Sequence, residues 1–261
     1  MLDTPVRVSI TKQVLTALRD ATLVTLFPTA CRVCGEIIES WRDGIACATC
    51  WEKIVQTRDL ESACAKCGAP LKSLPFDGQI NERRCGRCDH FAFNYARAVG
   101  PYEGALRESV LWLKTNPHLS PRVSQLLISS FAASPELRDS ESIVPVPLHP
   151  RRLSERTFNQ AEIIAAALSS ATGLRVETAG VVRVKQTAHH RAGMGARERA
   201  RSLAQSFQVR APRLIENRAL LVVDDVMTTA STAHEIAQTL IEGGARSVKI
   251  LTLARAVSEL G

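Results

Sequence analysis

The sequence predicts an α/β protein in which an open, mainly parallel sheet with flanking helices follows a small four-cysteine metal module. Two observations support this fold class. All 8 cysteines lie between residues 31 and 88, so the chain divides into two parts of different composition. After residue 92, short apolar runs alternate with segments of helical length, the pattern of parallel strand–helix–strand units.

The bulk composition is that of a soluble globular protein. Hydrophobic residues make up 45% of the 261 residues and charged residues 23%. No apolar run reaches the roughly 20 residues that a membrane-spanning helix needs, and the N-terminus lacks the pattern of a signal peptide. We therefore expect a cytoplasmic protein without a membrane span.

The order of these features predicts three regions. Apolar residues in 10–27 recur with a helical period until Pro28, which indicates a helix packed on the metal module rather than on a membrane surface. We expect an N-terminal helix in 1–28, a double zinc-ribbon module in 29–91 and the α/β domain in 92–261.

The cysteines form four C-x-x-C pairs, a spacing that lets one tight turn direct two sulfurs at a single tetrahedral ion. The pairs are Cys31/Cys34, Cys47/Cys50, Cys64/Cys67 and Cys85/Cys88. Two structural Zn²⁺ ions use every ligand. The alternatives are a disulfide framework, which is rare in cytosol, and a redox motif, for which one pair would suffice. We expect the first pair to join the second and the third to join the fourth, because these loops are shorter to close.

In the second part, apolar runs predict strands at 142–146, 181–184, 219–223 and 248–253, with helices at 159–171 and 231–242 between them. Gly243 and Gly244 end the second helix. Ligands of such sheets bind at the carboxyl ends of the strands.

One of these strand ends carries the best-marked site. Asp224 and Asp225 follow an apolar strand, where vicinal hydroxyls would give them partners. The segment Thr228, Thr229, Ala230, Ser231 and Thr232 then leads into a helix whose N-terminus can hold an anion. Carboxylates for a diol beside an anion site predict a phosphorylated ribose as ligand. The alternative is that Thr229 or Ser231 only caps the helix and that the two aspartates are solvated.

Net charge is +7, and the basic excess is uneven. Eight basic residues against Glu198 lie in 183–213: Arg183, Lys185, Arg191, Arg197, Arg199, Arg201, Arg210 and Arg213. This excess is compatible with binding single-stranded DNA, or with a solvated face.

The strand end that carries Asp224 and Asp225 resembles a motif of a known family. The segment 222–232 is similar to the motif of type I phosphoribosyltransferases that binds phosphoribosyl pyrophosphate (PRPP). V-P-V-P-L-H at 144–149, R-T-F-N-Q at 156–160, L-A-R at 253–255 and the N-terminal cysteines resemble the ComF family of amidophosphoribosyltransferase-type proteins.

The resemblance implies roles for individual residues. Asp224 and Asp225 would take the ribose hydroxyls and residues 228–232 the 5′-phosphate. The pyrophosphate and its Mg²⁺ would lie near 147–152, where His149, Arg151 and Arg152, with Arg156 behind them, supply candidate contacts. Four positions depart from the family pattern: Thr157 and Ala230 replace glycines, His190 a glutamine and Ser202 an asparagine. Ala230 must either accept a left-handed conformation, at a cost of about 1 kcal/mol, or let the loop relax.

Three functions stay open from the sequence. The ComF resemblance implies a role in DNA uptake and natural transformation, with single-stranded DNA and other uptake proteins as partners. The second is an active phosphoribosyltransferase of nucleotide metabolism. The third is a non-catalytic regulator that senses PRPP and binds DNA.

Overall fold

The computed structural model describes residues 22, 24–56, 63–71, 84–86, 88–185 and 205–256. Of the helix expected over 10–27, residues 22 and 24–26 are helical within the described part, and residues 1–21 and 23 lie outside it. No helix among the described residues is both long and apolar enough to span a membrane.

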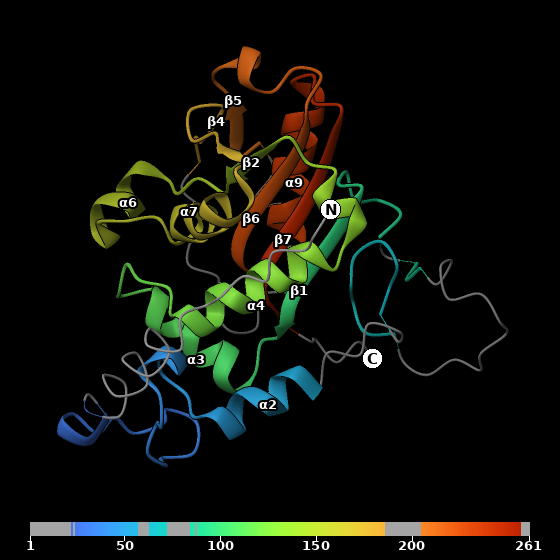
Figure 1. The fold of residues 1–261 in the computed structure, drawn as a ribbon. Helices are drawn as coiled ribbons and strands as arrows, with labels where there is room; N and C mark the ends of the chain where they lie inside the picture. Colours follow the sequence, from blue (N-terminus) through green and yellow to red (C-terminus); the bar gives the residue numbers. More distant parts are fainter. Residues whose placement is uncertain are drawn as a thin grey trace, which may run out of the picture.

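A five-stranded sheet organises the chain (Figure 1), and every pairing in it is parallel, as predicted. Its strands are ordered β1-β7-β6-β2-β3. Their bounds are β1 Tyr95–Pro101, β2 Ser142–Pro145, β3 Arg175–Val176, β6 Ala219–Met227 and β7 Ser247–Arg255. The central strands β6 and β7 are buried along nearly their whole length, which explains why they read as continuous apolar runs.

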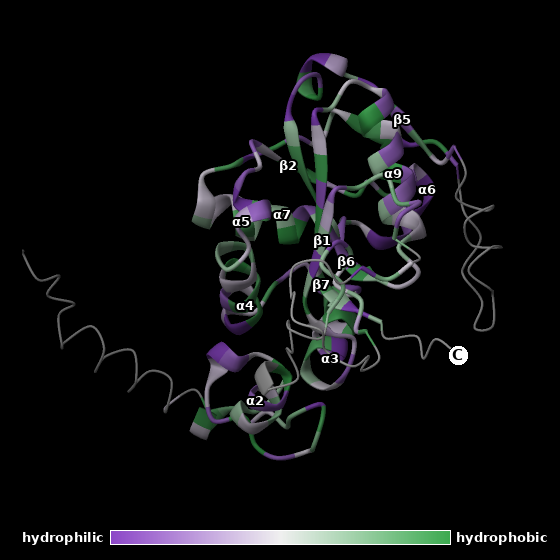
Figure 2. Cartoon of the chain, turned by 90° about the vertical axis from the view of Figure 1, so that its right-hand side faces the viewer, coloured by the Kyte–Doolittle hydropathy of each residue, from purple (hydrophilic) through white to green (hydrophobic). Residues whose placement is uncertain are grey.

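Helices cover both faces of the sheet (Figure 2). One face carries α4, α5 and α7, and the other carries α9. The helices are α2 Ala48–Gln56, α3 Gly104–Leu113, α4 Pro121–Ala132, α5 Pro135–Arg138, α6 Pro150–Arg156, α7 Gln160–Thr172 and α9 Ser231–Glu242, with 3₁₀ turns η1 Trp41–Asp43 and η3 Pro212–Leu214. The helix predicted at 231–242 has the bounds that the sequence indicated.

Two expectations about strands need correction. The strand predicted at 219–223 continues to Met227, because its residues keep pairing with β7 past the apolar run. Val181–Arg183 forms β4, which pairs antiparallel with β5 (Phe207–Val209) in a separate two-stranded sheet rather than in the main one.

Two hydrophobic cores lie on the two faces of the main sheet. Side chains alternate along β6, so Leu221 and Val223 enter one core while Leu220 and Val222 enter the other. The first core also contains Cys31, Cys47, Cys50 and Trp51, and the second contains Cys64, Cys67 and Cys88. The first two C-x-x-C turns thus extend the core on one face of the sheet, and the last two extend the core on the other face.

Candidate functional site

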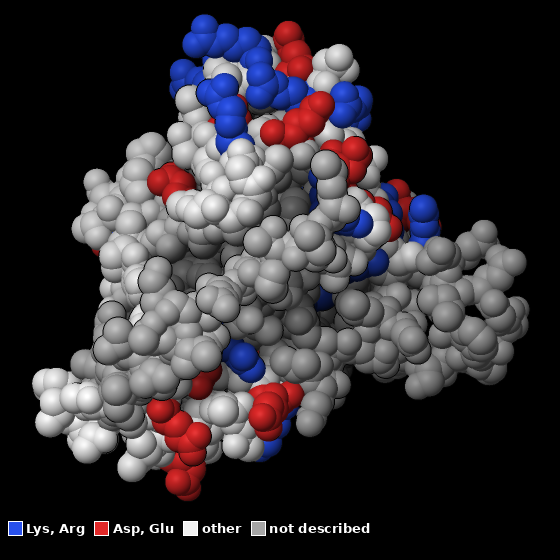
Figure 3. All heavy atoms as spheres, in the orientation of Figure 1, with Lys and Arg blue, Asp and Glu red and all other residues white. Residues whose placement is uncertain are grey.

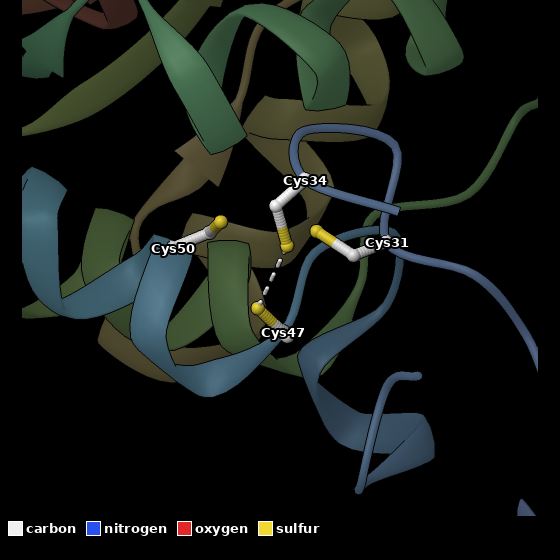
Figure 4. Close-up of side chains that lie close together, drawn as sticks. All are labelled: Cys31, Cys34, Cys47 and Cys50. Atoms are coloured by element: carbon white, nitrogen blue, oxygen red, sulfur yellow. Dashed lines mark hydrogen bonds between the residues drawn. The ribbon is translucent and has the colours of Figure 1, made fainter. Parts of the chain in front are cut away.

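The first two C-x-x-C pairs form one cluster (Figure 4). The sulfurs of Cys31, Cys34, Cys47 and Cys50 point toward one another and lie within 4.8 Å of one another. Cys50 is on α2, and the loop of Cys31 and Cys34 closes on Gly35, whose φ of 83° is the left-handed conformation expected after such a turn.

The other two pairs form a second cluster of the same kind. Its ligands are Cys64, Cys67, Cys85 and Cys88, again with sulfurs within 4.8 Å of one another. Gly68 has a φ of 65° and matches Gly35. The sequential pairing is therefore confirmed: first with second, third with fourth. Four thiolates at this spacing fit tetrahedral Zn²⁺ and leave no open coordination position, so both sites are structural.

Contacts from the sheet hold the second cluster in place. Arg255, at the end of β7, donates from Nη1 to the carbonyl oxygen of Cys67 over 2.6 Å, and its Nη2 lies 3.9 Å from the Cys67 sulfur. The main-chain N–H of Ala96 in β1 donates to the carbonyl of Lys66. Burial lowers the pKa of the Arg255 guanidinium and the neighbouring thiols oppose that shift, as expected for a cation beside a negatively charged zinc–thiolate cluster.

A separate cleft of about 350 Å³ lies where β2 and β6 end, the position expected for a ligand of a parallel sheet. Its volume is in the range of small-molecule sites. Two carboxylates and four cations line it: Asp224, Asp225, Lys114, Arg152, Arg156 and Arg183. The cleft can therefore take a ligand that combines hydroxyl groups with strong negative charge.

The two predicted carboxylates, Asp224 and Asp225, line this cleft from the C-terminal half of β6. Asp224 accepts the main-chain N–H of Asp225 over 2.9 Å. Burial raises the pKa of Asp224 well above its usual range, the charge of Asp225 adds to the shift, and Arg183 opposes it. Because burial disfavours the charged form of Asp224, a ligand that donates hydrogen bonds to this carboxylate would stabilise it.

The loop after β6 makes the sharp turn that the predicted anion site requires. Ala230 is the N-cap of α9, with φ 63° and ψ 9°, and is buried. The loop therefore keeps its sharp turn with alanine in the left-handed region and does not relax. Thr229 and Ser231 hydrogen-bond to each other through their hydroxyls at 2.8 Å, and no side chain caps α9. The interpretation of these hydroxyls as caps is therefore wrong, and among the described residues no side chain caps the N-terminus of α9.

The structure divides the residues predicted around 147–156 into two groups. Arg152 and Arg156, four residues apart on one face of α6, both line the cleft. Arg151 points to solvent and forms an exposed ion pair with Glu155 at 3.4 Å. His149 is the N-cap of α6, where its Nδ1 accepts the N–H of Arg151 at 3.3 Å. Neither His149 nor Arg151 lines the cleft.

Sequence reasoning missed cleft residues that come from distant segments. Arg183 lies at the end of β4, with its guanidinium 5.5 Å from the ring centre of Phe207 in β5. Tyr102 and Lys114 come from the segments after β1 and α3. Arg183 belonged to the basic segment 183–213, but only the β4–β5 pairing shows that it turns toward Asp224.

Comparisons with known proteins agree with this architecture. Residues 22–89 match the double zinc ribbon domain, and residues 158–260 match the phosphoribosyl transferase domain. The chain is 31% identical over 239 residues to DNA utilization protein YhgH of Salmonella typhimurium, covering 87% of this chain and 97% of that protein. The chain belongs to the ComF family.

Other ComF relatives show the same extent of similarity. YhgH of Escherichia coli K12 is 30% identical over 237 residues, covering 87% of this chain and 97% of that protein. Competence protein F of Haemophilus influenzae is 28% identical over 210 residues, covering 74% and 90%. Among solved structures, the PRPP amidotransferase of B. subtilis aligns at 17% identity and a TM-score of 0.35, covering 70% of this chain and 34% of that one.

The two domain matches fit the two kinds of site in this ComF chain. The double zinc ribbon match spans both cysteine clusters, and the phosphoribosyl transferase match spans β6, the anion loop and α9. The protein therefore combines two structural zinc sites with a phosphoribosyltransferase-type α/β domain.

Proposed function

We propose that this ComF-family protein binds PRPP, or another ribose-5-phosphate ligand, with Mg²⁺ in the cleft, and that it acts in the cytoplasm in the uptake or use of DNA. One observation carries the first half. Adjacent carboxylates at the end of β6 and a left-handed loop into the N-terminus of α9 open into one cleft, which three arginines line.

Each group in the cleft has a task in this proposal. Asp224 and Asp225 accept hydrogen bonds from the 2′- and 3′-hydroxyls of the ribose. The loop 228–232 and the N-terminus of α9 hold the 5′-phosphate. Arg152, Arg156 and Arg183 neutralise the pyrophosphate. Carboxylate and phosphate oxygens are the ligands that Mg²⁺ prefers, so the donor set fits the ion, which when bound would neutralise the leaving group further.

The same cations favour a second candidate, an active phosphoribosyltransferase. Loss of pyrophosphate from C1 leaves a cation-like ribose, and basic groups around the leaving group stabilise that step. The experiment measures binding and turnover separately: calorimetry with Mg²⁺ and PRPP, and pyrophosphate release across a panel of bases. Binding without release would favour a sensor of PRPP, and no binding by the zinc-loaded protein would overturn the proposal.

The DNA half of the proposal draws on the relatives, whose names refer to DNA utilization and to competence. Single-stranded DNA and other uptake proteins are the partners that we propose. Basic side chains, with some carboxylates among them, gather at the end of the molecule where β5 and η3 lie (Figure 3). Of the segment 183–213, residues 186–204 lie outside the described part. Binding of an oligonucleotide should weaken steeply with salt, because phosphate contacts release counterions.

A further inference from the structure

A second cavity, of about 420 Å³, lies between the first zinc ribbon and helices α3 and α4. Figure 1 shows the ribbon, in blue, beside these helices. This indole cavity, as we name it, is lined by Trp41, Trp112, Arg32 and His118, with smaller side chains between them. It shares no lining residue with the cleft at the end of β6.

Two of the three tryptophans, Trp41 and Trp112, lie at this cavity. The third, Trp51, is fully buried, and its Nε1 donates to the carbonyl of Asp43 over 2.9 Å. Trp41 by contrast is 39% exposed. The protein therefore keeps one indole for its core and places two at an open cavity.

Charge at the indole cavity has one sign. The guanidinium of Arg32 lies over the ring of Trp112, 4.5 Å from its centre, within the range of a cation–π interaction. Among the described residues that line the cavity, none is acidic. The two indole rings can contact a flat ring, and the Arg32 cation can bind an anion attached to that ring.

The first zinc cluster builds one wall of this cavity. Arg32 follows the ligand Cys31 directly, and Trp41 begins η1, which Ser40 caps. Gly44 ends η1 with φ 74°, and a Cβ there would lie 2.6 Å from the Cβ of Ser120 at the start of α4. A side chain at position 44 would therefore clash with Ser120, and a zinc ion held by Cys31 would keep the neighbouring Arg32 beside Trp112.

We propose that the indole cavity binds a base of single-stranded DNA, with Arg32 contacting the adjoining phosphate. This inference rests on the proposed role in DNA handling and assigns that role a place. Bases stack on tryptophan and arginine planes irrespective of sequence, as in other single-strand binding proteins. A cavity in the range of small-ligand sites has room for one nucleotide.

Intrinsic fluorescence tests the proposal directly, because two of the three tryptophans line the cavity. Titration of the zinc-loaded full chain with a short oligothymidylate should quench Trp41 and Trp112 and leave the signal of Trp51. Trp112→Leu should weaken oligonucleotide binding by about 5- to 150-fold, the range of one lost base stack. Trp112→Phe, which keeps a ring, should retain most of the affinity. Zinc content and circular dichroism confirm folding of each variant.

The outcomes separate the inference from the function on which it rests. If the oligonucleotide binds with wild-type affinity to Trp112→Leu and to Trp41→Leu, the base binds elsewhere and only the inference fails. If the wild-type protein binds no oligonucleotide, the proposed role in DNA handling fails with it. Binding of Mg²⁺ and PRPP, measured by calorimetry, should be unchanged in both variants. An apolar dye that binds the cavity and is not displaced by oligothymidylate would indicate a protein-docking surface instead and overturn the proposal.

Discussion

Two residues, one in the proposed phosphate loop and one at the end of α6, hold backbone conformations that usually require glycine. Ala230 has a φ of 63° and Thr157 a φ of 67°. Both replace glycines of the family pattern, so the turns are kept although the residue that makes them easy is gone. For alanine the cost is on the order of 1 kcal/mol. For threonine, whose β-branch crowds the backbone further, the conformation is a rarer exception.

Replacing Thr157 by glycine should therefore stabilise the protein. Thr157 is the C-cap of α6, and its N–H donates to the carbonyl of Leu153 over 2.7 Å, a bond that glycine keeps. We expect Thr157→Gly to raise the free energy of unfolding by about 1 kcal/mol, measured by urea denaturation.

Gly173 offers the matched control. It is the left-handed C-cap of α7, with φ 76° and no heavy atom within 4 Å of an added Cβ. Gly173→Ala should cost about 1 kcal/mol from backbone strain alone. A loss of stability in Thr157→Gly would show that the Thr157 hydroxyl, which donates to the carbonyl of Arg156 over 2.6 Å, stabilises α6 more than the turn strains it.

The raised pKa of Asp224 predicts a pH dependence of stability with a definite sign. Between the ordinary carboxyl pKa of 3.8 and the raised value, the folded protein binds more protons than the unfolded chain. Stability from this group therefore falls as pH rises through that window. Asp224→Asn should be more stable than the wild type at neutral pH without ligand, and the double variant Asp224→Asn/Asp225→Asn should lose PRPP binding while staying folded.

Asp139 serves as a control of opposite sign. Its hydrogen bond with Lys249, at 2.8 Å, lowers the pKa of this carboxyl, so its contribution to stability is lost as pH falls. Thermal unfolding from about pH 2 to pH 8 compares the two, because the contribution of Asp139 is lost only below its ordinary pKa of 3.8. Asp224→Asn that unfolds more readily than the wild type at neutral pH would mean that the carboxylate pair is structural.

At the scale of an element, α6 shows how helical period separates residues that are adjacent in sequence. Arg152 and Arg156 face the cleft, while Arg151 faces solvent. Arg156→Gln should weaken binding of Mg²⁺ and PRPP by about 10- to 150-fold, because hydrogen bonds to charged groups contribute about 1.5–3 kcal/mol. Arg151→Gln should change it little, since an exposed i,i+4 pair contributes about 0.5 kcal/mol. Equal effects in calorimetry would remove the distinction.

The elements also show what sequence could predict. The knuckles, their pairing, the strand before Asp224 and helix α9 follow from local signals: C-x-x-C spacing, an unbroken apolar run and paired glycines. The extra length of β6 did not, because polar Asp224 pairs with Thr252 only once β7 is in place. The position of Arg183 in the cleft depends on the β4–β5 pairing, which joins strands separated by residues 184–206. The local sequence does not show that Arg152 faces the cleft and Arg151 faces solvent, because that depends on where α6 begins.

At the scale of the whole molecule, the two zinc ribbons differ in their connections. The first joins the core under α3 and α4, and the second joins the core under α9. The second also reaches the cleft through Arg255. The carbonyl of Arg255 accepts the N–H of Tyr102, and Ala256 donates to the carbonyl of Met227. Tyr102 and Ala256 both line the cleft.

Loss of one zinc ion should therefore have different effects at the two clusters. Metal analysis should return two zinc ions per chain, and Cys31→Ser and Cys64→Ser should each retain one. Cys31→Ser should unfold the first ribbon while residues 100–261 stay folded and bind PRPP. Cys64→Ser should weaken PRPP binding by about 10- to 100-fold, as loss of supporting contacts commonly does. Equal losses of PRPP binding would contradict the link through Arg255.

The hydrogen bond between Arg255 and Cys67 also bears on how the chain is made. Among the described strands, β1, which contacts the 64–68 turn, pairs in the main sheet with β7 alone, so one support of this turn and the strand partner of the other come from residues 247–255. Contacts between such distant segments form slowly. On the ribosome, the four cysteines of the second cluster can come together early. The hydrogen bond from Arg255 to Cys67 forms only after residues 247–255 have emerged. Until β7 is translated, the second cluster lacks its contact with Arg255, and a bound zinc ion would have to hold its two C-x-x-C turns together without it.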